Sequence, residues 1–150
     1  MTSFKFRLET LLKLRCADRD QRRAQLAQAY HAEQVIRDNA HDVAQQQQQL
    51  AQDARQASRP GVLDADRLLG MHRHHLVLQA QATTLRRQHE QLRPEIQRRR
   101  DALMHADQQV RVLEKLKEKQ LERHLDRQRK LEVKRLDEVA GRVAAVEGQP

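Results

Sequence analysis

Apolar residues recur in alternating steps of three and four along two long stretches of this sequence. Between residues 68 and 113, eleven of the fourteen positions at this spacing are apolar, and the exceptions are His75, His89 and Arg99. Between residues 8 and 57, ten of fifteen are apolar, with an arginine-rich gap from Arg15 to Arg22. This spacing is typical of the narrow apolar stripe of a coiled-coil helix. The pattern therefore predicts two long helices, each with one stripe to bury.

The strongest break in the pattern is the segment Ser58-Arg59-Pro60-Gly61, and Asp64 follows it as a candidate N-cap. Proline cannot continue a helix, and glycine accepts backbone conformations that other residues avoid. We predict one domain over residues 1–150, with a first helix over about 4–57, a loop over 58–63 and a second helix over about 64–146. Because so short a loop makes neighbouring helices antiparallel, the predicted fold is all-α: an antiparallel two-helix coiled-coil hairpin.

Pro94 lies inside the predicted second helix. Proline removes one backbone hydrogen bond and clashes with the preceding turn, so we expect a kink at this point. A break there would instead give three helices. Leu92 and Ile96 keep the same spacing on both sides of Pro94, which favours a continuous, kinked helix.

The two predicted helices differ in length, and the second extends past the first. Equal rise per residue places Phe4 opposite about residue 118, give or take a turn. Residues after about Leu121 would therefore form an overhanging C-terminal helix with no partner inside the chain. The apolar positions also shift to a different face after Leu113. These later positions are Leu116, Leu121, Leu125, Leu131, Leu136, Val139, Val143 and Val146.

Composition supports long helices and argues against a globular core. Only 2% of the residues are aromatic, 33% are charged, and there is no tryptophan. A single cysteine, Cys16, excludes an intramolecular disulfide framework. No apolar run approaches the roughly 20 residues that span a bilayer, and the N-terminus does not have the pattern of a secretory signal, so we expect a cytoplasmic protein without an integral membrane segment. The net charge of +8 favours acidic partners.

Candidate chemistry is sparse. His72, His74 and His75 lie close together, but the first two point to different helix faces, so we expect no metal site and no cofactor. No nucleophile or phosphate-binding motif is present, and we expect no enzymatic activity. The basic stretch from Lys115 to Arg135 is interleaved with acidic residues, which is typical of a solvated helix supported by ion pairs. Nucleic-acid binding is therefore a weaker alternative, and a self-associating coiled-coil scaffold is another.

Three segments resemble the flagellar export protein family FliJ: FKFRLETLLKLR at residues 4–15, LEKLKEK at 113–119 and LDEVA at 136–140. The resemblance implies a non-enzymatic, cytoplasmic component of the flagellar type III export apparatus, peripheral at the inner face of the cell membrane. It implies a coiled coil similar to the gamma stalk of rotary ATPases. Its implied partners are the hexameric export ATPase FliI, the export gate protein FlhA and export chaperones. A stalk protein of a virulence type III secretion system is the closest alternative.

The resemblance also suggests which residues contact these partners. The residues that would contact the ATPase ring are Phe4, Leu8, Leu11, Leu12, Arg15, Leu116, Lys117, Lys119, Gln120 and Arg123. Those that would contact the export gate are Met71, His72, His75 and Leu76.

Overall fold

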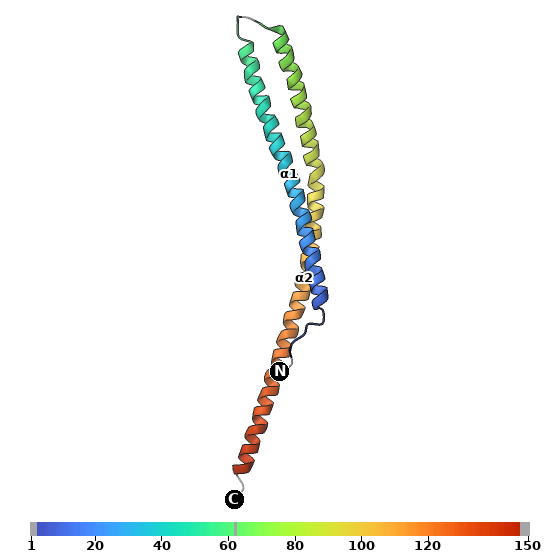
Figure 1. Cartoon of the computed structure of the whole chain (residues 1–150), viewed down its shortest axis with the longest axis vertical. Coiled ribbons are helices and arrows are strands. Elements are labelled where there is room, and N and C mark those ends of the chain that lie inside the picture. The colour runs from blue at the N-terminus through green and yellow to red at the C-terminus, as the bar shows by residue number, and fades with distance from the viewer. Residues whose placement is uncertain (1–2, 62, 148–150) are drawn as a thin grey trace. The chain divides into compact units, whose positions relative to one another are not determined.

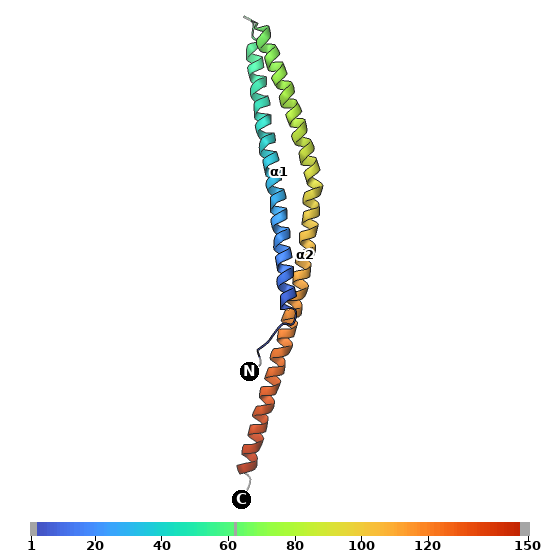
Figure 2. The same ribbon diagram turned by 45° about the vertical axis from the view of Figure 1, so that its right-hand side comes forward.

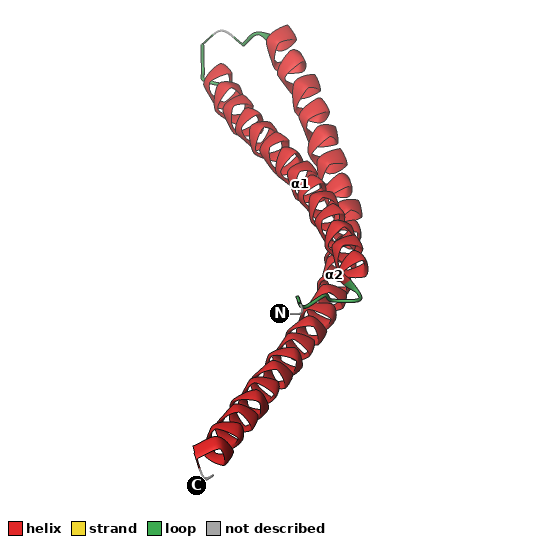
Figure 3. Ribbon diagram, turned by 60° about the horizontal axis from the view of Figure 1, so that its bottom comes forward, coloured by secondary structure: helices red, strands yellow, loops and turns green. Residues whose placement is uncertain are grey.

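The computed structural model describes residues 3–61 and 63–147, with side chains described as far as residue 143. Two helices make up most of this part of the chain: α1 spans Glu9–Ala57 and α2 spans Ala65–Glu147 (Figure 1). No strand occurs in the described ranges, where every regular element is a helix (Figure 3). The predicted all-α class is confirmed.

Helix α1 begins at Glu9, so the predicted start at about residue 4 is wrong. Residues 3–6 have no regular structure, and a turn leads into the helix, where the Glu9 amide donates to the Phe6 carbonyl at 3.2 Å. The reason is a packing contact: Phe6 is 7% exposed, and the chain departs from helical geometry to bury its ring. Glu9 then stands in the first turn, where a carboxylate interacts favourably with the helix dipole.

The connection between the helices is stabilised by local hydrogen bonds. The Ser58 hydroxyl and amide both donate to the carbonyl of Ala54, at 2.8 and 3.1 Å, which satisfies a carbonyl at the end of α1. On the other side, Asp64 acts as an N-cap, because its carboxylate accepts from the Arg67 amide at 3.2 Å. Helix α2 then runs through Pro94 without ending there. The kink expected at Pro94 stays a prediction.

The chain divides into two compact units. Unit 1 contains residues 1–20 and 105–150, and unit 2 contains residues 21–104. Each unit takes one segment from α1 and one from α2. The predicted organisation as one domain over residues 1–150 stays a prediction.

The core of unit 1 is a small apolar cluster. Phe6, Leu12 and Val110 are buried, and Val110 is 0% exposed. Four partly buried side chains pack against this cluster: Phe4, Leu8, Cys16 and Leu113. The extended N-terminal segment, the first turns of α1 and α2 therefore share one core.

The core of unit 2 lies between α1 and α2, which are side by side in this region (Figures 1 and 2). Its buried side chains are Ala29, Val43, Leu78 and Ile96, which all occupy predicted stripe positions. Of the fourteen stripe positions predicted for the second helix, only His75 is exposed. On the first helix, Arg22 and Ala40 are the exposed exceptions among fifteen. The stripe pattern thus identified the side of each helix that is least exposed.

Candidate partner-binding surfaces

Polar and aromatic contacts attach the N-terminal segment of unit 1 to α2. The Lys117 ammonium donates to the Glu9 carboxylate at 2.8 Å and lies 5.9 Å from the centre of the Phe6 ring. The Phe4 and His124 ring centres are 5.7 Å apart. Phe4 therefore lies opposite His124, beyond the predicted position near residue 118. The cause is the extended segment, because a non-helical residue spans about 3.3 Å instead of the 1.5 Å of a helical one.

Partial burial continues along α2 with polar side chains. Lys117, Gln120, His124 and Gln128 are partly buried at steps of three and four after Leu113. In the same region Leu116 is 37% exposed and Leu121 is 38% exposed. The face that lies against the N-terminal segment thus becomes polar, while the leucines turn outward.

A second set of apolar side chains is exposed further along α2 in unit 1. Gln128 is partly buried, and the other described side chains from residue 125 to 143 are exposed. Leu125 is 42% exposed and Leu136 is 68% exposed. We define the C-terminal stripe as Leu125, Leu136, Val139 and Val143, because helical geometry places these four on one face. Grouped exposed apolar side chains of this kind mark interaction sites more often than isolated ones do.

The ten predicted ATPase-contact residues differ in exposure. Leu12 is buried, and Phe4, Leu8, Arg15, Lys117 and Gln120 are partly buried, whereas Leu11, Leu116, Lys119 and Arg123 are exposed. Phe6 was not among the predicted site residues, yet it is buried. Its burial could have been predicted, because Phe4, Phe6 and Leu8 alternate as apolar residues do in an extended segment. Leu14 lies off the stripe and is 66% exposed.

Three of the four predicted gate-contact residues come together in unit 2. Met71, His72 and His75 line a hollow of about 230 Å³ together with Leu50 and Leu68. Leu76 is 50% exposed and does not line this hollow. No group of three or more histidine, cysteine or acidic residues in the described ranges is placed to hold a metal ion.

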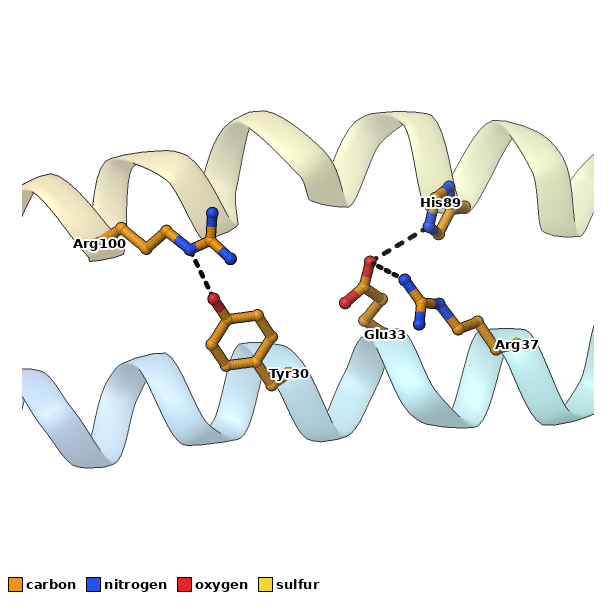
Figure 4. Close-up of polar contacts among 5 residues, drawn as sticks. All are labelled: Tyr30, Glu33, Arg37, His89 and Arg100. Atoms are coloured by element: carbon orange, nitrogen blue, oxygen red, sulfur yellow. Dashed lines mark hydrogen bonds and ion pairs between the residues drawn. The ribbon is translucent and has the colours of Figure 1, made fainter.

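Polar side chains of α1 and α2 in unit 2 contact one another (Figure 4). The Glu33 carboxylate oxygen Oε1 accepts from His89 Nε2 at 3.2 Å and from Arg37 at 3.1 Å. Arg100 donates to the hydroxyl of Tyr30, and its guanidinium carbon lies 5.5 Å from the centre of that ring. Contacts of this kind join α1 to α2 at specific positions.

Arg99 occupies another polar position of the stripe, and its guanidinium has hydrogen-bond partners. Its Nε donates to Glu95 at 2.8 Å, and a second nitrogen donates to the carbonyl of Gln25 on α1. The hydrogen bond from Arg99 lowers the pKa of Glu95, because it stabilises the ionised carboxylate. In unit 1, the hydrogen bond to Asp20 raises the pKa of Arg19 in the same way.

The fold is that of an all-helical protein, with two long helices packed together and grouped apolar side chains exposed. The family model described as "Flagellar FliJ protein" matches residues 4–149, nearly the whole chain. The chain therefore belongs to the FliJ family, whose members are non-enzymatic components of flagellar protein export. Comparison with curated proteins and with solved structures gave no match. Within the described residues, neither helix has a segment long and apolar enough to cross a bilayer.

Proposed function

We propose that this chain is the stalk of a flagellar type III export apparatus, and that it couples the hexameric export ATPase to the export gate. In this proposal the two helices form an antiparallel coiled-coil hairpin, and the C-terminal part of α2 overhangs α1. The chain acts in the cytoplasm at the inner face of the membrane, has no catalytic activity of its own, and also contacts export chaperones. The family match supports this proposal and favours a flagellar over a virulence system.

The observation that carries the proposal is the C-terminal stripe. Its four apolar side chains are between 42% and 68% exposed. Helices in proteins owe most of their stability to packing of an apolar face, so a helix whose stripe is in water gains stability when a partner covers that stripe. An apolar collar inside the ATPase ring would provide such a cover.

Exposed charged residues that precede the stripe along α2 suit the same partner. Lys119 and Arg123 are exposed, as are Leu11 and Leu116, and all four are among the predicted ring contacts. In this proposal they contact the ring directly. The partly buried Leu8 and the buried Leu12 hold the first turns of α1 against α2.

The coupling mechanism follows from symmetry. A two-helix rod has no sixfold symmetry, so it contacts the subunits of a hexameric ring unequally. Unequal contacts shift conformational equilibria only by the difference in binding free energy between states. The stalk would therefore favour one nucleotide state at the subunit interface that it contacts most closely.

The stripe assignment is tested by binding of the purified export ATPase hexamer to full-length variants. Replacing Leu136, Val139 and Val143 together with glutamine should weaken binding more than tenfold, because each buried aliphatic side chain contributes roughly 1.5–3 kcal/mol. The matched control replaces Leu131 and Val133, which are each 55% exposed but lie off the stripe. Circular dichroism checks that the helices remain. Unchanged binding of the stripe variant would refute the assignment.

Contact with the export gate is tested separately. In the proposal the gate protein is contacted by Met71, His72, His75 and Leu76. The first three also line the hollow beside Leu50 and Leu68. Replacing Met71 and Leu76 with alanine should weaken capture of the gate protein and leave ATPase binding unchanged. Equal capture by the variant and the wild type would rule out this surface.

Two competing functions predict different outcomes. A self-associating scaffold would use the C-terminal stripe to pair with its own copy, and sedimentation would then show a dimer that the stripe variant loses. A nucleic-acid-binding arm would bind generic DNA with a steep salt dependence. The acidic residues within the basic stretch after Lys115 favour the stalk over DNA binding.

A further inference from the structure

Two adjoining hollows in unit 2 form a groove that the export role does not use. The first has a volume of about 730 Å³ and the second about 480 Å³, and Arg37 lines both. The side chains of Arg86, Arg93 and Arg100 also line them. We call this surface the arginine groove and define it by these four arginines.

The four arginines make the groove strongly basic. Glu33 is the only acidic residue among those that line it, and its carboxylate already accepts from Arg37 and His89. Arg86 and Arg93 are exposed and form no ion pair or hydrogen bond within the described part of the chain. A guanidinium offers five donors and suits carboxylates well, so these two side chains are available to an acidic ligand.

The spacing of the arginines selects an extended ligand. Arg86, Arg93 and Arg100 are seven residues apart, so they lie on one face of α2 at intervals of about 10.5 Å. All three cannot converge on one phosphate or one small polycarboxylate, because Arg86 and Arg100 are about 21 Å apart along the helix. A helix running along the groove would present acidic side chains at the same interval of seven residues.

The floor of the groove is apolar. Ile96 is 7% exposed and Leu85 and Ile36 are partly buried, and all three line the hollows. Apolar side chains on one face of a ligand helix would pack there, as in other helix-in-groove complexes. A sugar–phosphate backbone has no such side chains, and the groove offers only the rings of Tyr30 and His89 as platforms for a base.

A neighbouring hollow of unit 2 lacks this basic lining. Its lining residues include Asp42, Asn39 and Thr84 but no lysine or arginine. A second copy of this chain is a poor occupant of the groove, because its net charge is +8. An acidic helix of a different protein is the better match for the charge of the groove.

We propose that the arginine groove binds an acidic amphipathic helix of a partner protein, with carboxylates on the arginines and aliphatic side chains on the apolar floor. The proposal does not depend on the stalk function. It predicts that the opposite charge and the helical apolar stripe of the ligand are both required for binding.

The probe is a synthetic, fluorescein-labelled peptide of about three heptads, with leucine at the a and d positions and glutamate at e and g. Its control is a scrambled peptide of the same composition without the stripe. Fluorescence anisotropy with the full chain measures both affinities. We expect the patterned peptide to bind at least about tenfold more tightly than the scrambled one, which keeps the charge but loses the apolar contacts.

Matched variants locate the site. Replacing Arg86 and Arg93 with glutamine should weaken peptide binding about tenfold, because two exposed ion pairs together contribute about 1.4 kcal/mol. The control replaces Arg73 and Arg87, which are exposed, have the same charge and do not line the groove. The control should change the affinity less than about twofold. All four substitutions lie on the exposed surface of α2, and circular dichroism confirms its helicity.

Four results would overturn the proposal. Absence of binding of the patterned peptide would exclude the ligand, and equal binding of the scrambled peptide would show charge attraction alone. Equal loss in the two double variants would show that the groove has no special part in binding. Displacement of the peptide by a duplex DNA oligonucleotide at a lower concentration than by unlabelled peptide would make the groove a nucleic-acid site.

Discussion

Val110 is the best-buried side chain of unit 1, and its truncation tests the small core directly. The side chain is 0% exposed and lies in the cluster with Phe6 and Leu12. Replacing it with alanine removes two methyl groups, at about 0.8 kcal/mol each, and leaves a cavity between these partners. We therefore expect the free energy of unfolding to fall by about 2 kcal/mol.

The matched control for this truncation is Val112→Ala in the same region of α2, where the side chain is 65% exposed. Both substitutions change helix propensity equally, so their difference isolates burial. Urea denaturation followed by circular dichroism measures both variants. We expect the control to change stability by less than about 0.5 kcal/mol. Equal losses in the two variants would refute the account of this core.

Three further predictions concern polar contacts. Asp64→Ala removes the N-cap of α2 and should speed amide hydrogen exchange in its first turn about fivefold, since a cap contributes about 1 kcal/mol; Asp66→Ala, which removes no capping bond, should not. A double-mutant cycle on Glu9 and Lys117 should give a coupling of about 0.5 kcal/mol in urea denaturation, since both side chains are more than a third exposed; zero coupling would contradict the contact. The lowered pKa of Glu95 means that its carboxylate stabilises the fold above the ordinary carboxyl pKa, and that this is lost as the pH falls through the lowered value. Thermal unfolding should therefore show Glu95→Gln as less stable than wild type at neutral pH and equal to it in acid.

The sequence predicted the buried faces of the helices because burial in a two-helix packing depends mainly on periodicity. Leu78, Ile96 and Val110 were stripe positions, and all three are buried. Periodicity is a local property of the chain, so it predicts the buried face of a helix even when the partner helix is unknown. The same reasoning identified the loop, whose proline and capping aspartate act within a few residues.

The start of α1 could not be predicted in the same way. Phe6 leaves the helical pattern because a tertiary contact with the cluster around Val110 is worth more than one further helical turn. Which residues of α2 it meets depends on long-range geometry that local spacing does not contain. The candidate site differs from the prediction as a result, because Phe4 contacts His124 instead of a residue near 118.

The candidate binding residues were only partly accessible to sequence reasoning. A motif indicates that a segment matters, but it does not separate side chains that hold the fold from those that face outward. Leu12 and Leu116 both belong to such segments, yet the first is 8% exposed and the second 37%. The arginine groove could not be predicted from the sequence, because its lining comes from two segments that meet only in the folded chain.

The contact between Glu33 and His89 has a consequence for how the helices of unit 2 can slide. A shift of α2 by seven residues, about 10.5 Å along its axis, would superpose one apolar stripe position on another at little cost in apolar burial. It would also bring Ala82 or Ile96 opposite Glu33, whose side chain is only 16% exposed, and leave a carboxylate without its histidine. The Glu33 carboxylate would keep its bond to Arg37 and lose one hydrogen bond, which costs about 0.5–1.5 kcal/mol. The pair therefore favours one register of the two helices. Packing of alanines and leucines alone would permit several registers.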